Sequence, residues 1–231
     1  TTSRTVDSNG EVLVAWVEGS SSPYNIRFGK AHHFSLEPVV RVSPAGTSVV
    51  EVARNSKGHI VVVYVEPDST FWAAYYNGTD LPSSYDDWDR VMLIGNTTDG
   101  GGVIADTGRF SAHFEVFIRN DIMHVVWVGG DRDPYYSKCN VSADISAIAT
   151  TSNWKKADGT QGYDHVSTQT GDHPSLIVSS DNRPMFAYGY NRFAWWGGSS
   201  WTDYSAFISE GDVVSLGIDE NDMVWGVFVN N

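Results

Sequence analysis

One pattern recurs five times in this chain: a polar turn, then a strand that ends in an aromatic residue. The stretch "DSNGEVLVAWVEG" (7–19) places Asn9-Gly10 before Trp16, and "NSKGHIVVVYVEP" (55–67) matches it without a gap. Three further copies place the pairs Asn120-Asp121, Asp181-Asn182 and Asn221-Asp222 before the aromatic residues Trp127, Tyr188 and Phe228. A repeat on this scale constrains the fold more strongly than any single motif.

Each repeat predicts four strands. The dipeptides tolerate the left-handed backbone of a two-residue hairpin turn, so each turn should join two antiparallel strands. The runs around the turn, such as "SVVEVAR" and "IVVVYV", are almost continuously apolar, which is typical of strands buried on both faces. An aromatic-rich run and a looser fourth run follow, as in "FWAAYYNG" and "DRVMLIG".

The fold class predicted is therefore all-β: a β-propeller of four-stranded antiparallel blades, with about five repeats visible and the last one incomplete. The 231 residues are 41% hydrophobic and 13% aromatic, which suffices for a sizeable core. We expect residues 1–231 to form a single β-propeller domain. The fifth repeat stops at "MVWGVFVNN", after its second strand.

The unfinished fifth repeat leaves alternatives open. Another chain, or sequence absent here, completes the blade; otherwise this is a short five-blade ring with an incomplete last blade. An open propeller leaves an unpaired sheet edge, which proteins normally cover. We therefore expect either a partner at the termini or a longer parent protein.

Charge narrows the list of partners. The formal net charge is −13 and the pI is near 4.7, which disfavours binding to nucleic acid and to anionic membranes. No apolar run approaches the roughly 20 residues that span a bilayer. We expect no nucleic-acid partner, no membrane insertion and no cofactor, although an acidic face could collect calcium.

Other motifs concern processing and location. The single cysteine, Cys139, cannot form a disulfide within the chain and is expected to be buried and inert. Asn77, Asn96 and Asn140 lie in Asn-x-Ser/Thr sequons, which favour a secreted protein or one on a virion or cell surface. Asn77 and Asn96 are the better acceptors, because Asn140 lies close to a predicted strand.

The working surface is predicted from connectivity. If the hairpin turns share one face, the loops that leave the second strands and enter the first strands share the other, which we call the rim. Two positions past each aromatic residue of the repeat stand Glu18, Glu66, Gly129, Tyr190 and Asn230. Nearby loops add further polar candidates: Asp106, Asp131, Arg132, Asp133, His165, Asp172, His173, Asn191, Glu210 and Asp212.

Aromatic residues suggest what the rim recognises. The repeated aromatics are assigned to packing between blades, but several others lie on or beside rim loops. A flat ring flanked by carboxylates and amides suits a neutral sugar, whose C–H face packs on the ring while its hydroxyls bond to polar groups. The candidate ligand-binding residues are Tyr190, Asn191, Trp195, Trp196, Glu18, Glu66 and Asp131.

The segment "HPSLIVSSDNRPMFAYGYNRFAWW" (173–196) resembles the repeat of BNR-like propellers, a group that includes sialidases, polysaccharide lyases and lectins. The sialidase Asp-box is not present in full; "TTSNWKKADGTQGY" (150–163) holds similar residues in another order. An arginine triad cannot be assembled from spacing. The resemblance therefore implies a carbohydrate-related propeller but transfers no catalytic residue.

Three functions stay open. A lectin or adhesin module would bind a glycan or polysaccharide through rim loops. A polysaccharide lyase or glycosidase would need acid–base groups in one groove, and a lyase could use His165, His173, Tyr190 and Arg192. A purely structural part in a larger assembly is the third.

Overall fold

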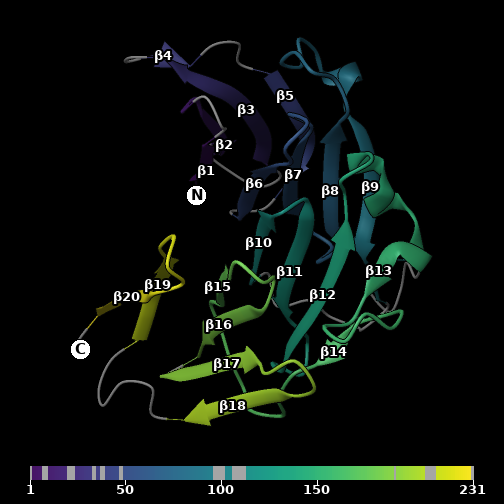
Figure 1. The fold of residues 1–231 in the computed structure, drawn as a ribbon. Helices are drawn as coiled ribbons and strands as arrows, with labels where there is room; N and C mark the ends of the chain where they lie inside the picture. The colour runs from purple at the N-terminus through teal and green to yellow at the C-terminus, as the bar shows by residue number, and fades with distance from the viewer. Residues whose placement is uncertain are drawn as a thin grey trace.

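The structure is a computed structural model that describes residues 2–6, 10–19, 24–32, 35–36, 40–46, 49–95, 102–105, 113–189, 191–205 and 212–229. Within these residues the chain forms five antiparallel sheets that follow one another in sequence. Figure 1 shows them arranged along an arc from β1 to β20.

The five sheets are numbered here as blades 1 to 5. Blade 1 contains β1 (Thr2–Val6), β2 (Val12–Glu18), β3 (Tyr24–His32), β4 (Ser35–Leu36) and β5 (Val40–Gly46). Blade 2 contains β6 (Val50–Arg54), β7 (Ile60–Val65), β8 (Phe71–Tyr76) and β9 (Asp89–Ile94). Blade 3 contains β10 (Phe114–Arg119), β11 (Ile122–Val128), β12 (Pro134–Asn140), β13 (Trp154–Lys155) and β14 (Asp164–His165). Blade 4 contains β15 (Ser175–Val178), β16 (Pro184–Tyr188), β17 (Arg192–Trp196) and β18 (Trp201–Ser205), and blade 5 contains β19 (Asp212–Ile218) and β20 (Val224–Val229).

The first strands of the blades lie side by side. Strand β1 contacts β6, β6 contacts β10, β10 contacts β15, and β15 contacts β19. These first strands therefore form the inner layer, with the later strands of each blade outside it (Figure 1). This is the β-propeller predicted from the repeat, with the fifth blade incomplete within the described residues.

The repeated aromatic residues occupy one register, as predicted. Trp16 pairs with Thr2, Tyr64 with Val50 and Trp127 with Phe114, each pair joining the second strand of a blade to its first. Tyr188 and Phe228 also lie on second strands, β16 and β20. The side chains of Tyr64 and Trp127 are fully buried and Tyr188 is 1% exposed, while Trp16 is half-buried.

The hydrophobic core lies between adjacent blades. One cluster joins residues of blades 2 and 3 around Trp127, and a second joins blades 1 and 2 around Tyr64. A third cluster joins blades 3 and 4 around Tyr188. Each blade thus buries its apolar faces only against its neighbours, which is how repeat folds gain stability.

Three of the described hairpin turns are longer than the two-residue turn that we predicted. Asn120 and Asp121 do form a two-residue turn, with φ of 49° and 57°. In blades 2, 4 and 5 the loop has three residues and ends on a left-handed residue: Gly58, Asn182 or Asp222. This is the turn with a closing bulge, in which only the last residue needs a positive φ.

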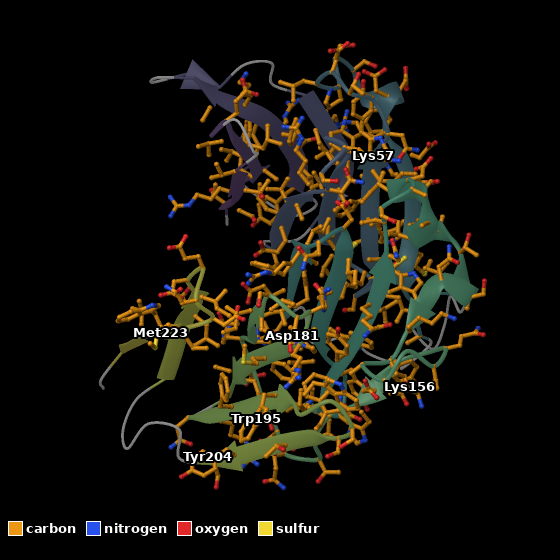
Figure 2. The ribbon with its side chains drawn as sticks, in the orientation of Figure 1. Lys57, Lys156, Asp181, Trp195, Tyr204 and Met223 are labelled. Carbon is orange, nitrogen blue, oxygen red and sulfur yellow. The ribbon has the colours of Figure 1, made fainter. Side chains whose placement is uncertain are left out.

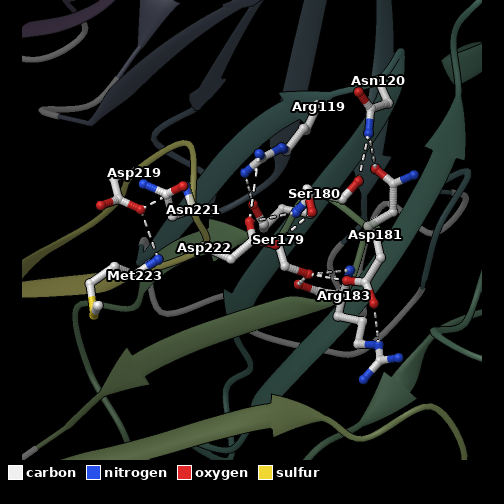
Figure 3. Close-up of polar contacts among 12 residues, drawn as sticks. Arg119, Asn120, Ser179, Ser180, Asp181, Arg183, Asp219, Asn221, Asp222 and Met223 are labelled. Atoms are coloured by element: carbon white, nitrogen blue, oxygen red, sulfur yellow. Dashed lines mark hydrogen bonds and ion pairs between the residues drawn. The ribbon is translucent and has the colours of Figure 1, made fainter.

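Hydrogen bonds tie the turns of neighbouring blades together. Asp121 of blade 3 accepts hydrogen bonds from the backbone N–H (2.7 Å) and Oγ (2.6 Å) of Ser56 in blade 2. Asp222 of blade 5 accepts from the same two groups of Ser180 in blade 4, at 2.7 and 2.5 Å (Figure 3). Asn120 links blade 3 to blade 4 by donating to the Ser180 carbonyl. The turn face is therefore fixed by repeated contacts between blades.

A second set of contacts joins the inner strands. The N–H of Val52 donates to Oγ of Ser3, and the N–H of Leu216 donates to Oγ of Ser175. Glu115 plays the same part between blades 3 and 4, where its carboxylate accepts from the N–H of Leu176. Burial, with a smaller contribution from the nearby Glu51, raises the pKa of Glu115 to about 8.

The helices of the described residues are short. They are the 3₁₀ turns η1 (Tyr85–Asp87), η2 (Ile145–Ala149) and η3 (Thr151–Asn153). None of the helices in the described ranges is long and apolar enough to cross a membrane.

Large apolar side chains are exposed on and beside blade 5. Trp225 is 64% exposed and Val227 is 62% exposed, both on β20. Met223, before β20, and Tyr204, on β18, are exposed as well, and Figure 2 shows both at the end of the arc.

Trp127 is fully buried and Trp225 is largely exposed, and this difference gives a stability prediction. Replacing Trp127 with Ala should lower the free energy of unfolding by about 3–5 kcal/mol, because a buried aromatic loses its packing and leaves a cavity. The matched change Trp225→Ala should cost less than about 1 kcal/mol, because that ring is largely in solvent. Denaturant unfolding measures both, and equal losses would contradict the blade packing.

Glu115 gives a pH prediction. Its raised pKa means that the folded state binds the proton more tightly than the unfolded state, so stability should fall as pH rises from about 5 to about 9. Glu115→Gln keeps an acceptor for Leu176 and should remove on the order of 2 kcal/mol of this loss. Denaturant unfolding at about pH 5 and at about pH 9 measures this difference, with Glu18→Gln at an exposed position as the control. If the free energy of unfolding of Glu115→Gln changes with pH as much as that of the wild type, Glu115 is not the group responsible.

Candidate functional site

Most of the charged residues that we predicted on the rim lie at blades 3 and 4. The loop 129–133, between β11 and β12, is a tight turn in which the Gly129 N–H donates to the Asp133 carbonyl at 2.9 Å. Arg132 occupies its left-handed position, with a φ of 69°. The turn therefore presents Asp131, Arg132 and Asp133 together at the end of blade 3.

His165 lies against this turn. Strand β14 pairs with β12 and sets His165 opposite Tyr135. The two rings stack with centroids 4.9 Å apart, and Nε2 of His165 lies 2.7 Å from Oδ2 of Asp133. The Tyr135 hydroxyl donates to Asp131 at 2.6 Å. Burial, and then the contact with Asp131, raises the pKa of Tyr135, so this hydroxyl stays protonated and keeps Asp131 in place.

These groups could hold a metal ion. One ligand atom each from Asp131, Asp133 and His165 lie within 4.8 Å of one another. Calcium takes oxygen ligands, whereas an imidazole with two carboxylates better suits a transition-metal ion. The donor set therefore fits zinc or manganese better than the calcium considered from the sequence.

Asp172 joins the two blades. Its carboxylate forms an ion pair with the Arg132 guanidinium at 2.5 Å. The backbone on either side is fixed, because Gly171 N–H donates to the Arg132 carbonyl and Gly189 N–H donates to the Asp172 carbonyl, both at 2.8 Å. A Cβ on Gly171 would lie 2.3 Å from the ring of Tyr188. The loop that enters blade 4 therefore packs directly on the repeated aromatic.

Two histidines meet beside Asp172. The rings of His113 and His173 have centroids 4.0 Å apart, and Nδ1 of His113 lies 3.4 Å from Oδ1 of Asp172. His173 has a positive φ of 48°, in the left-handed region that few residues other than glycine adopt. Burial, and then the neighbouring His173, lowers the pKa of His113, so its imidazole is neutral at neutral pH. A neutral imidazole can accept a proton.

Arg192, a residue of the lyase hypothesis, is engaged within blade 4. Its guanidinium donates to the Tyr188 hydroxyl at 3.1 Å and to Oδ2 of Asp203 at 2.5 Å. Ser167 donates to the same carboxylate oxygen at 2.6 Å. Burial acts to raise the pKa of Asp203, but the hydrogen bonds from Arg192 and Ser167 outweigh it and lower the pKa. Arg192 therefore links strands, and its charge is already neutralised.

We predicted that Trp195 and Trp196 lie beside Asn191 at the rim, and the structure shows that this is wrong. Both residues lie on β17, which starts at the rim and runs away from it, and Trp195 pairs with Met185 near the opposite face. Trp196 is only 8% exposed in the cluster between blades 3 and 4. Tyr190, the third aromatic in that set, lies outside the described residues.

The other predicted ligand residues are dispersed. Glu18 is exposed at the end of β2 and forms an ion pair with Arg27 at 2.7 Å. Glu66 follows β7, and burial raises its pKa, with Asp68 adding to the effect. Of the described residues in the predicted ligand set, Asp131 and Asn191 belong to the rim of blades 3 and 4, Asn191 in the loop between β16 and β17. His165 and His173 from the lyase set lie there as well.

The processing motifs fall on the turn face. Asn77, just after β8, and Asn140, the last residue of β12, are both exposed, so the ranking of Asn77 above Asn140 has no basis in burial. Asn96 lies outside the described residues. Cys139 is fully buried, and burial raises the pKa of its thiol to about 12, as expected for an inert cysteine.

Sequence reasoning missed His113 and Tyr163. His113 directly precedes the residue opposite Trp127, and His173 holds the same place relative to Tyr188 when the pairing of β15 with β16 is extended by one residue. An alignment of the repeats on these aromatics would have found this pair. Tyr163 packs edge-on against Tyr135, with centroids 5.8 Å apart, which no spacing in the sequence indicates.

No protein-family model and no curated protein sequence matches this chain. Its structure is similar to that of a protein of unknown function from Dyadobacter fermentans, with a TM-score of 0.64 at 10% identity, covering 98% of this chain and 74% of that one. It is also similar to an ulvan lyase bound to -[GlcA(1-4)Rha3S]-, with a TM-score of 0.60 at 11% identity, covering 100% of this chain and 68% of that one.

A third similar structure is a variant of the Aleuria aurantia lectin in complex with alpha-methyl-L-fucoside. Its TM-score is 0.51 at 11% identity, covering 88% of this chain and 59% of the lectin. At these identities the likeness shows the fold alone. The chain therefore shares the propeller fold with carbohydrate-active lyases and a fucose lectin.

Proposed function

We propose that this protein is a carbohydrate-binding β-propeller that recognises a glycan along the rim of blades 3 and 4. One observation carries the proposal: loops from two blades converge there to present a cation, carboxylates and imidazoles on fixed backbone. The rim of blades 3 and 4 replaces the surface around Trp195 and Trp196 as the expected sugar site.

The exposure of these groups suits a sugar ligand. The Arg132 side chain is 57% exposed and His165 is 42% exposed, yet both are held by an ion pair or a hydrogen bond. Sugar hydroxyls need donors and acceptors whose positions are already fixed, since ordering them on binding would cost affinity. The half-buried Tyr163 and the outer face of His165 offer flat surfaces for a sugar ring.

The similar structures and the repeat support the choice of ligand class. The ulvan lyase and the Aleuria aurantia lectin were each solved with a carbohydrate bound. The resemblance to BNR-like repeats points the same way. We further propose that the protein acts outside the cell or on a virion or cell surface, where the sequons at Asn77, Asn96 and Asn140 could be glycosylated.

Two arginines provide a matched test of the binding surface. Arg132 pairs with Asp172 at the rim, and Arg183 pairs with Asp181 at 2.7 Å on the turn face, with similar exposure. On a glycan array followed by calorimetry, Arg132→Ala should weaken binding at least about tenfold, because a charge-assisted hydrogen bond is lost. Arg183→Ala should bind like the wild type. Equal losses would place the ligand elsewhere, and a wild type that binds no glycan would overturn the proposal.

A polysaccharide lyase is the second candidate, favoured by the contact between His113 and His173 beside Arg132. Lyase chemistry needs a cation to neutralise a uronate carboxylate and a base to remove the adjacent proton. Arg132 could supply the cation and one of the two histidines the base. Arg192 is less suited, because its side chain is only 19% exposed, whereas that of Arg132 is 57% exposed.

The lyase candidate has a pH signature. With His113 as the base, its lowered pKa keeps the imidazole neutral as pH falls, so activity on a uronate polysaccharide should persist below about pH 6.5, the ordinary histidine value, and decline only at lower pH. Near-ultraviolet absorbance of unsaturated products measures it. His113→Gln should reduce the rate at least about 100-fold, while Arg183→Ala on the turn face should not. A wild type that releases no unsaturated products excludes this candidate.

The incomplete blade suggests a partner. We propose that two further strands pair with β20 and complete blade 5, supplied by another chain or by polypeptide beyond residues 1–231. Exposed Trp225 and Val227 support this, because such side chains are normally covered in a finished blade. A structural role within a larger assembly is compatible with the same feature.

A further inference from the structure

A cavity of about 500 Å³ lies on blade 3 at the end opposite the rim. The last part of β12, the start of β11 and β13, and the segment between β12 and β13 form its walls. Its lining residues are Ile122, Lys138, Asn140, Ser142, Ala143, Ala147, Asn153 and Lys155. Ammonium, amide and hydroxyl groups predominate among the polar ones, and no carboxylate is in the set.

The two lysines of the cavity face each other across a strand pair. Lys138 on β12 is paired with Lys155 on β13 in the antiparallel register. Directly opposed side chains on neighbouring strands have Cβ atoms about 5 Å apart, and like charges placed there destabilise the sheet. The arrangement is unexpected in a protein with a net charge of −13 and five lysines in all.

No carboxylate in the cavity lining neutralises this pair, although Asp164 and Asp158, outside the lining, act electrostatically on the Lys138 ammonium. Nζ of Lys138 donates to the Ala157 carbonyl at 2.8 Å, which is a neutral acceptor. The ammonium of Lys155 has no hydrogen bond or ion pair with any residue that the structure describes. Lys57 of blade 2 adds a third cation nearby, since its Nζ donates at 2.8 Å to the carbonyl of Ala143, which lines the cavity.

We propose that this cavity binds an oxyanion, the sulfate or carboxylate group of an acidic ligand. Lys138 and Lys155 supply the charge, and Asn140 and Ser142 supply polar groups at the mouth. An oxyanion between the two ammonium groups would convert the repulsion across β12 and β13 into two attractive pairs. The cavity lies on the turn face of blade 3, so it is separate from the glycan site proposed at the rim.

A neighbouring lysine provides the control. Lys156 directly follows Lys155 but does not line the cavity, and Figure 2 shows it on the outer part of blade 3. Sodium sulfate and sodium acetate would be titrated separately at constant ionic strength, with backbone amide NMR of Asn140, Ser142 and Lys155 as the readout. The wild type and Lys156→Gln should show the same saturable shifts. Lys155→Gln should bind at least about tenfold more weakly, and Lys155→Arg should keep most of the affinity.

Thermal unfolding separates a binding site from a structural one. Without the anion, Lys155→Gln should melt about 1–3 °C higher than the wild type, because the repulsion with Lys138 is removed. With saturating anion the wild type should gain stability and Lys155→Gln should gain little. The proposal is overturned if neither anion gives saturable shifts, or if Lys155→Gln and Lys156→Gln respond alike. A response to sulfate alone identifies a sulfate group, and a response to acetate identifies a carboxylate.

Discussion

The inner layer of the propeller depends on hydrogen bonds that cross from blade to blade. The first strand of each blade has one edge without a partner in its own sheet, and its N–H groups need acceptors. Ser3, Glu115 and Ser175 stand at one register and accept from the first strand of the next blade. These contacts set the height of each blade relative to its neighbour. They therefore determine which rim residues meet.

The rim of blades 3 and 4 follows from that alignment. Because the blades share one register, His113 and His173 hold equivalent places and come into contact across the blade boundary. Asp172 lies between the blades and bonds to Arg132 of blade 3. On the opposite face, the contact of Ser180 with Asp222 (Figure 3) repeats that of Ser56 with Asp121. The rim of blades 3 and 4 and the contacts between turns each need residues from two blades.

The sequence predicted what the repeat encodes and little of what depends on pairing between strands. The places of Tyr64 and Trp127, and the two strands of blade 5 among the described residues, could be predicted because the pattern recurs at fixed spacing. Trp195 and Trp196 were misplaced, because closeness to Asn191 in sequence was taken as closeness in space. A strand advances about 3.3 Å per residue, so four or five residues carry a side chain across the blade. The pairing of Lys138 with Lys155 needs the register of β12 against β13, which spacing does not give.

Blade 5 also sets how the protein opens. Its two strands are fastened to blade 4 by few polar contacts, among them those of Asp222 with Ser180 and of Leu216 with Ser175, and much of its apolar surface faces water. Elements with little buried surface unfold locally at a fraction of the global free energy. In residues 1–231 alone, amide hydrogen exchange should therefore be fastest in β19 and β20 and slowest in β7 and β11. Pairing of two further strands with β20 would therefore slow exchange in blade 5 more than in any other blade.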